Sequence, residues 1–215
     1  VEVKKEKRTG NEKDFEMPKQ CPVCGADAIR EEGESAIRCT GIECPAKLFR
    51  NLVHFVSREA MNIDGLGENI IGQLLDNNLI ENIADIYTLT FDEIASLKKN
   101  GKKFAQNLID SINKSKQNDL YHLLTAFGIR HVGVKASKLL AKKYKTIDNL
   151  MLAPLEELSE IKDIGEVMAS SIREFFEQAQ TIDLIEKLKQ AGVNMNYLEE
   201  EGNDNRFEGK TFVLT

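Results

Sequence analysis

The sequence predicts a mainly α-helical chain in which four similar helical hairpins follow a small four-cysteine module and precede a short, truncated β segment. Three observations support this fold class. Glycine recurs at intervals of 34, 32 and 32 residues within one local pattern, at Gly67, Gly101, Gly133 and Gly165. All four cysteines lie near the N-terminus. Tryptophan is absent and aromatic residues make up only 7% of the chain, a composition that favours helices over sheets.

The N-terminal part is expected to be a charged tail, or the end of a preceding domain, over residues 1–20, followed by a metal module over residues 21–48. The cysteines of the module are spaced C-x2-C, fourteen residues, C-x4-C, at Cys21, Cys24, Cys39 and Cys44. Two knuckles so separated place four thiolates around one tetrahedral Zn²⁺. Four protein ligands close the coordination sphere, so the zinc is expected to be structural.

Turn residues divide this module further. Gly25 and Gly41 are expected to form the turns of the two knuckles, and residues 28–38 a β-hairpin with its turn near Gly33. Two disulfides are the alternative use of four cysteines, but a chain without a secretory signal makes them improbable. His54 lies in a helical pattern beyond the module and is expected on a helix surface or partly buried, not at the metal.

Residues 49–198 carry the glycine repeat. In each unit an apolar residue stands four positions before the glycine, another stands seven positions after it, and a mostly small residue stands four positions after it. The pattern predicts a helix that ends, a tight turn for which the glycine supplies backbone freedom, and a second helix that starts at the turn. Such a helix-hairpin-helix turns backbone N–H groups and a helix N-terminus outward, which suits a phosphate whatever base it carries.

Ordinary antiparallel helix pairs, with glycines serving only as caps, are the alternative to this interpretation. Three units carry an apolar residue directly before the glycine, at Leu66, Val132 and Ile164, and this regularity favours the hairpins. The second unit has Asn100 at that position. We therefore expect the second hairpin to be divergent.

Charge is distributed unevenly along the chain. The formal net charge is −6, but residues 98–145 contain twelve Lys or Arg against two acids, whereas residues 146–215 contain six against fifteen. The basic block covers the second and third hairpins, where phosphates are already expected. A solvated lysine-rich helix face is the alternative. Each phosphate neutralised would add about 0.9 to the slope of log affinity against log salt.

The C-terminal residues differ in composition and pattern from the helical repeats. Residues 199–206 are expected to form an acidic linker, and residues 207–215 the start of another domain with an alternating strand pattern. No apolar run approaches the ~20 residues that cross a bilayer, so a soluble, cytosolic protein without a membrane partner is expected. A start at Val1 and a stop inside the strand-like run suggest a piece of a longer protein.

No catalytic residue is predicted. Asn62-Ile63-Asp64-Gly65 is similar to the K-x-D-G nucleophile motif of nucleotidyl transferases, but asparagine cannot form the lysine phosphoramide. Gly209-Lys210-Thr211 lacks the first glycine of a phosphate-binding loop, because Asp204 stands there.

The order of these modules resembles the C-terminal part of bacterial NAD-dependent DNA ligase. The strings that carry the resemblance are Cys21-Pro-Val-Cys24-Gly, Asn62-Ile-Asp-Gly-Leu-Gly67, Phe127-Gly-Ile-Arg-His-Val-Gly133 and Gly209-Lys-Thr-Phe-Val-Leu-Thr215. The resemblance implies that residues 207–215 begin a BRCT domain. It also implies a nick-sealing ligase of DNA replication and repair, whose nucleotidyl-transferase part uses NAD and Mg²⁺ outside this chain.

For this chain the resemblance implies a monomeric, bacterial, nucleoid-associated protein that grips nicked double-stranded DNA across the minor groove and performs no chemistry itself. The predicted contacts in the first two hairpins are Ile63, Asp64, Gly65, Leu66, Gly67, Lys98, Lys99, Gly101 and Lys102. Those in the third are Gly128, Ile129, Arg130, His131, Val132, Gly133, Lys135 and Lys138. A non-catalytic module of another repair protein, or a protein-interaction scaffold, are the alternatives.

Overall fold

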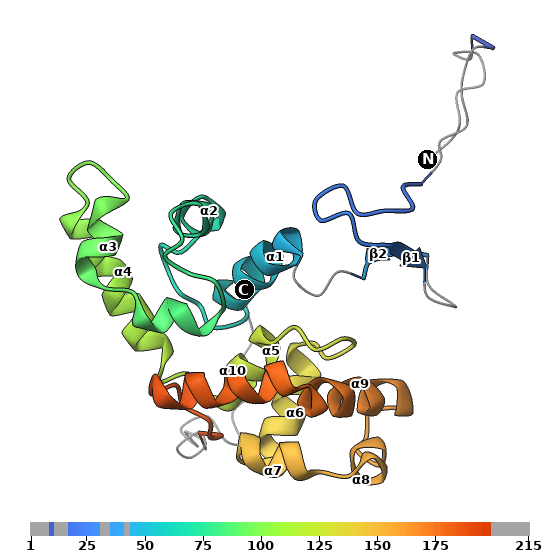
Figure 1. Ribbon diagram of the computed structural model, residues 1–215. Helices are drawn as coiled ribbons and strands as arrows, with labels where there is room; N and C mark the ends of the chain where they lie inside the picture. Colours follow the sequence, from blue (N-terminus) through green and yellow to red (C-terminus); the bar gives the residue numbers. More distant parts are fainter. Residues whose placement is uncertain (1–8, 11–16, 31–34, 41–43, 199–215) are drawn as a thin grey trace, which may run out of the picture. The chain divides into compact units, whose positions relative to one another are not determined.

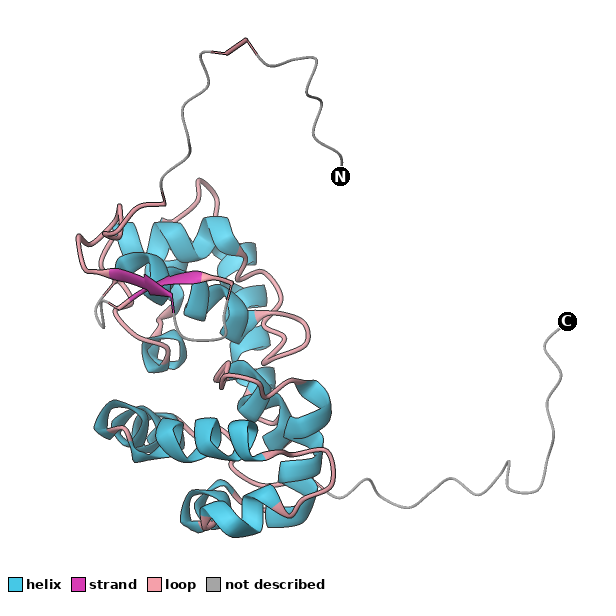
Figure 2. Ribbon diagram, turned by 90° about the vertical axis from the view of Figure 1, so that its right-hand side faces the viewer, coloured by secondary structure: helices cyan, strands magenta, loops and turns pink. Residues whose placement is uncertain are grey.

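The computed structural model describes residues 9–10, 17–30, 35–40 and 44–198, and most of them lie in short helices (Figure 1, Figure 2). The chain divides into two compact units, Val1–Leu48 and Phe49–Thr215. The predicted linker and the predicted β segment at the C-terminus lie outside the described residues, as do Gly33 and Gly41.

The first unit contains a small antiparallel sheet. Strand β1 (Ala28–Arg30) pairs with β2 (Ile37–Cys39), and Ala28 lies opposite Cys39. The pairing agrees with the β-hairpin that the sequence predicts over residues 28–38. This strand pairing places Cys39, the first cysteine of the second pair, at the end of β2.

The regular elements in the described part of the second unit are all helices. Its elements are α1 (Pro45–Val56, which begins in the first unit), α2 (Glu68–Asp76), the 3-10 helix η2 (Ala84–Thr88), α3 (Phe91–Ser96), α4 (Lys102–Ser115), α5 (Leu120–Ala126), α6 (Val134–Tyr144), α7 (Ile147–Leu152), α8 (Leu155–Ser159), α9 (Glu166–Glu177) and α10 (Ala179–Gln190). No helix among the described residues is long and apolar enough to cross a bilayer.

Four turns connect helices in the way the repeat predicts. We name them hairpin 1 (Ile63–Gly67, before α2), hairpin 2 (Leu97–Gly101, between α3 and α4), hairpin 3 (Ile129–Gly133, between α5 and α6) and hairpin 4 (Ile161–Gly165, between α8 and α9). The helices on either side of hairpins 2, 3 and 4 pack against each other. The mainly helical fold with four helix-hairpin-helix units is therefore confirmed.

The repeated pattern supplies the core. The residues seven positions after each repeat glycine are 0–1% exposed, and they are Leu74, Leu108, Leu140 and Ile172. The residues four positions after the glycine are all 0% exposed, and they are Ile71, Ala105, Ser137 and Ala169. Burial of these two positions anchors each second helix, because apolar surface removed from water contributes ~25 cal/mol per Å².

Candidate metal centre and nucleic-acid interface

The four cysteines of the first unit converge on one point. Their Sγ atoms all lie within 4.8 Å of one another, and the closest recorded separations are 3.4 Å for Cys24 to Cys39 and 3.9 Å for Cys21 to Cys44. A disulfide needs about 2.05 Å, so no pair is oxidised. Four thiolates at the ~2.3 Å Zn–S distance of a tetrahedral site are separated by similar spacings.

Local backbone structure sets this convergence. Gly25 adopts a left-handed φ of +72° and donates its N–H to the Cys21 carbonyl at 2.9 Å, which closes the first knuckle. The second knuckle starts at the end of β2 and ends at Cys44, directly before Pro45 at the first position of α1. Proline suits that position because it has a helical φ and lacks an N–H.

The sulfur environment also favours a cation. The backbone N–H groups of Cys24 and Val23 lower the pKa of Cys21 to about 6. The Ala26 N–H lowers the pKa of Cys24, but the adjoining Cys39 sulfur, desolvation and the Cys44 sulfur together outweigh it and raise that pKa to about 12. Four sulfurs at this spacing become thiolates together only around a cation. The donor set therefore fits Zn²⁺ held by Cys21, Cys24, Cys39 and Cys44.

Hairpins 1, 3 and 4 share one backbone geometry. In each, the residue before the glycine donates its N–H to the carbonyl of the first hairpin residue, at 3.3 Å for Leu66, 3.0 Å for Val132 and 2.9 Å for Ile164. Those three side chains are 1–7% exposed. The next residue is the glycine, which caps the following helix in an extended conformation.

The residue with a positive, left-handed φ in each of these turns is not the repeat glycine that the sequence pattern suggested. Gly67, Gly133 and Gly165 have φ between −83° and −96°, which any residue adopts. Positive φ occurs two positions earlier, at Gly65, His131 and Asp163. The prediction that the repeat glycine supplies backbone freedom is therefore wrong for these three hairpins, since the turn has already closed before the chain reaches the glycine.

The absence of a side chain at these three glycines has no explanation inside the described structure. A Cβ added to Gly67, Gly133 or Gly165 meets nothing within 4 Å, and all three residues are exposed. The first N–H groups of the helix that follows have no intrahelical acceptor. The three helix ends can therefore accept close approach of an external anion such as a phosphate.

Hairpin 2 differs, as its sequence predicted. The positive φ falls on Asn100, directly before the glycine, and Gly101 has helical φ and ψ of −70° and −2°. Gly101 is buried, and a Cβ there would lie 2.4 Å from the Ala95 carbonyl oxygen. Close packing against α3 explains this glycine, so its lack of a side chain does not mark an open anion site.

An alanine substitution distinguishes the closely packed Gly101 from the open repeat glycines. We expect Gly101→Ala to lower the free energy of unfolding by roughly 1–3 kcal/mol, because the added methyl overlaps a backbone carbonyl that cannot move without shifting α3. Chemical denaturation followed by circular dichroism measures the change. Gly165→Ala, at an open position, is the matched control, and an equal stability of the two variants would contradict the assignment.

Lysines surround hairpins 2 and 3, but several already have partners. Lys98 Nζ lies 3.8 Å from the Phe104 ring centroid, and Lys138 Nζ lies 4.8 Å from the Tyr121 ring centroid. Lys135 Nζ lies 2.9 Å from an Asp163 carboxylate oxygen, which links the helix after hairpin 3 to hairpin 4. The sequence did not predict that ion pair, which involves residues 28 positions apart.

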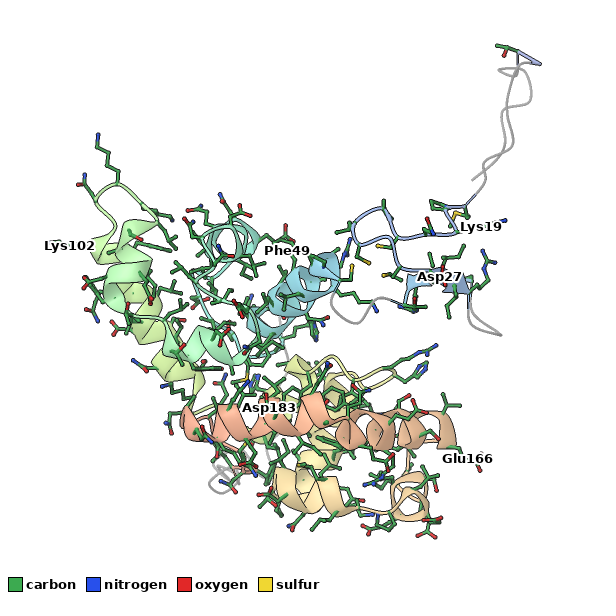
Figure 3. The ribbon with its side chains drawn as sticks, viewed as in Figure 1. Lys19, Asp27, Phe49, Lys102, Glu166 and Asp183 are labelled. Atoms are coloured by element: carbon green, nitrogen blue, oxygen red, sulfur yellow. The ribbon has the colours of Figure 1, made fainter. Side chains whose placement is uncertain are left out.

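The predicted contacts thus fall on separate turns of the second unit. Hairpins 1 and 3 each contain buried anchors, such as Ile63 and Ile129, and exposed residues around them. Lys99 is exposed within hairpin 2 and Lys102 directly after it, and Figure 3 marks Lys102 at the start of α4 and Glu166 at the start of α9.

One basic residue near hairpin 1 was missed by the sequence analysis. Arg58, exposed in the turn after α1, lines a hollow together with residues 62–68, which include hairpin 1. A basic residue a few positions before the first hairpin residue was the available signal, but the repeat pattern does not include that position.

Family models match all three parts of this arrangement. The C4 zinc finger domain of NAD-dependent DNA ligase matches residues 20–46. A SAM-like helix-hairpin-helix tandem matches residues 57–114, and a helix-hairpin-helix motif matches residues 122–185.

Curated relatives match the chain along its whole length. It is 53% identical over 218 residues to a DNA ligase of Acetivibrio thermocellus, 54% over 215 to that of Carboxydothermus hydrogenoformans and 46% over 220 to that of Bacillus subtilis. Each match covers 100% of this chain and 32–33% of the relative, so the chain spans about a third of their length. The chain therefore belongs to the family of NAD-dependent DNA ligases, as the portion that carries their C4 zinc finger and helix-hairpin-helix motifs.

Proposed function

We propose that this chain is the C-terminal, DNA-binding portion of a ligase that seals nicks in duplex DNA during replication and repair. It grips the sugar-phosphate backbone and the minor groove without reading sequence, and does no chemistry itself. The reaction, with NAD and Mg²⁺, belongs to a nucleotidyl-transferase part of the enzyme outside these residues.

One observation carries the proposal. Gly67 and Gly133 cap exposed helix ends, have ordinary φ values and leave open the space where a side chain would stand. A phosphate at that point would receive backbone hydrogen bonds and the favourable end of a helix dipole, both independent of the base. Sequence-independent binding follows, because phosphate contacts position a protein on DNA without specifying a base.

Charge favours hairpin 3 over hairpin 4 among the three open helix ends. Hairpin 1 carries Asp64 and is followed by Glu68, and the basic residue beside it is Arg58, which lines the same hollow. Hairpin 4 has the same geometry, but Glu160, Asp163 and Glu166 surround it, and Asp163 already faces Lys135. Hairpin 2 contributes through the side chains of Lys98, Lys99 and Lys102, while Gly101 is left out of the proposed contacts because it is buried.

The remaining parts have supporting functions in the same proposal. Zinc stabilises the fold of the cysteine module, which joins the hairpins to the catalytic part, and residues 207–215 begin a BRCT domain. We place the enzyme in the bacterial cytoplasm, at the nucleoid, where it acts as a monomer on nicked duplex DNA and has no membrane partner.

A titration tests the proposal. The zinc-loaded chain is added to fluorescent nicked and intact duplexes of one sequence at several salt concentrations, and anisotropy is recorded. We expect the nicked duplex to bind more tightly and log affinity to fall linearly with log salt, by about 0.9 per phosphate neutralised. Equal binding of both duplexes would contradict nick recognition by this part of the enzyme, and no binding at low salt would contradict DNA binding itself.

A further inference from the structure

A short connection, Lys116–Asp119, joins the first pair of hairpins to the second pair. It follows α4 and precedes α5. Connections of a few loop residues act as hinges when nothing else restrains them. In this structure, however, two backbone carbonyls and two side chains of the connection form hydrogen bonds with residues distant in the sequence.

The C-terminal segment, Asn194–Leu198, supplies most of those restraints. The Asn194 N–H donates to the Lys116 carbonyl at 2.8 Å, and its side-chain amide donates to the Asn118 carbonyl at 2.9 Å. The Leu198 N–H donates to the Asp119 carboxylate at 2.6 Å. The red end of the described chain accordingly lies beside the C-terminal end of α4 in Figure 1.

The same segment also holds the second pair of hairpins. The Ile147 N–H donates to the Met195 carbonyl at 3.0 Å, and the Tyr197 N–H donates to the Lys145 carbonyl at 2.7 Å. Met195 is 8% exposed. One extended segment therefore bridges the connection and the turn between α6 and α7.

Asn118 extends this network to hairpin 1. Its side-chain amide donates to the Met61 carbonyl at 2.7 Å, two residues before the hairpin begins. His122 Nδ1 donates to the adjoining Ala60 carbonyl at 2.7 Å, and His54 Nε2 donates to the Thr125 carbonyl at 2.8 Å. These bonds tie α1 and the entry of hairpin 1 to the connection and to α5, which leads directly into hairpin 3.

We propose that Asn118 and Asn194 are positioning residues for DNA binding, which hold hairpins 1 and 3 at one fixed separation so that both engage the same duplex. The inference rests on the proposed function. Two sites on a rigid ligand gain affinity from each other only when their geometry permits simultaneous engagement. An asparagine suits both positions because its amide donates to a carbonyl without adding charge.

The test uses Asn118→Ala, Asn194→Ala and the double variant in the full zinc-loaded chain. Asn113→Ala, at an exposed asparagine of α4, is the matched control. Anisotropy with a nicked duplex is recorded over a range of salt, and circular dichroism melting checks that each variant is folded at the titration temperature. The single variants remain informative if the double variant does not fold.

We expect the double variant to bind about tenfold more weakly and with a shallower salt dependence. If hairpin 3 disengages together with Lys135 and Lys138, the slope falls by about 2, because each lysine that leaves a phosphate lowers it by about 0.9. An unchanged affinity would overturn the inference, and so would weaker binding with an unchanged slope, because that result indicates a loss of folded protein alone. Failure of the unsubstituted chain to bind DNA would instead overturn the proposed function, and this inference with it.

Discussion

Gly133→Thr is expected to weaken binding to a nicked duplex by about tenfold or more while the protein stays folded. Gly133 is exposed, its φ of −96° suits any residue, and a Cβ there meets nothing within 4 Å. Threonine is also a favoured helix N-cap, so α6 is not expected to lose stability. The new side chain would occupy the space of a bound phosphate, and one charge-assisted hydrogen bond is worth ~1.5–3 kcal/mol.

Gly165→Thr is the matched control for this prediction. Gly165 caps α9 with φ and ψ of −88° and 173° and has an equally open Cβ position, but it lies in the acidic hairpin 4. We expect its affinity to stay within about twofold of the unsubstituted chain, because no phosphate is proposed there. Anisotropy titrations at one salt concentration give both values. A folded Gly133→Thr protein that binds as tightly as the unsubstituted chain would refute the contact at hairpin 3.

Cys39→Ser is expected to release the zinc and to unfold the cysteine module. Cys39 is one of four sulfurs that lie within 4.8 Å of one another, and a hydroxyl is a poor substitute for a thiolate as a zinc ligand. The module is too small to bury a sufficient core, so its folding depends on the metal. The helical unit has its own buried core and is expected to keep its helical circular dichroism signal.

Metal analysis after gel filtration measures this effect directly. The unsubstituted chain is expected to retain one zinc per molecule, and a chelator should remove it with loss of structure in the module alone. Ser35→Ala, an exposed change in the same module, serves as the control and should retain the metal. One equivalent of zinc in the Cys39→Ser protein would count against ligation by four thiolates.

The sequence predicted the helical hairpins well because their anchors are periodic. Buried residues such as Leu74 and Leu140 recur at a fixed distance from the glycine, and helices with such spacing have only one way to bury them. The cysteine site was equally predictable, because two short knuckles leave few arrangements for four thiolates.

The spacing of the repeat did not predict why each of its positions is occupied by glycine. Gly101 and Gly133 occupy the same place in the repeat, yet the first is fixed by a close backbone contact and the second has open space around it. Only the three-dimensional path of α3 distinguishes them. The left-handed turn residues Gly65, His131 and Asp163 share no side-chain chemistry, so no sequence pattern identified them.

Contacts between distant segments were also beyond the sequence analysis. The pair formed by Lys135 and Asp163 depends on how hairpins 3 and 4 pack, and the Asn194–Leu198 segment was assigned only to the end of the repeats. Side-chain hydrogen bonds to backbone carbonyls, such as that from Asn118 to Met61, leave no periodic trace in a sequence.

Backbone amide NMR of the zinc-loaded chain, with and without a nicked duplex, tests most directly whether helix ends hold the phosphates. We expect the largest shifts at the N–H groups of residues 67–69 and 133–135, with smaller changes at residues 165–167. Unchanged amides at the first two helix ends, with the main shifts on the acidic helices α9 and α10, would contradict this expectation.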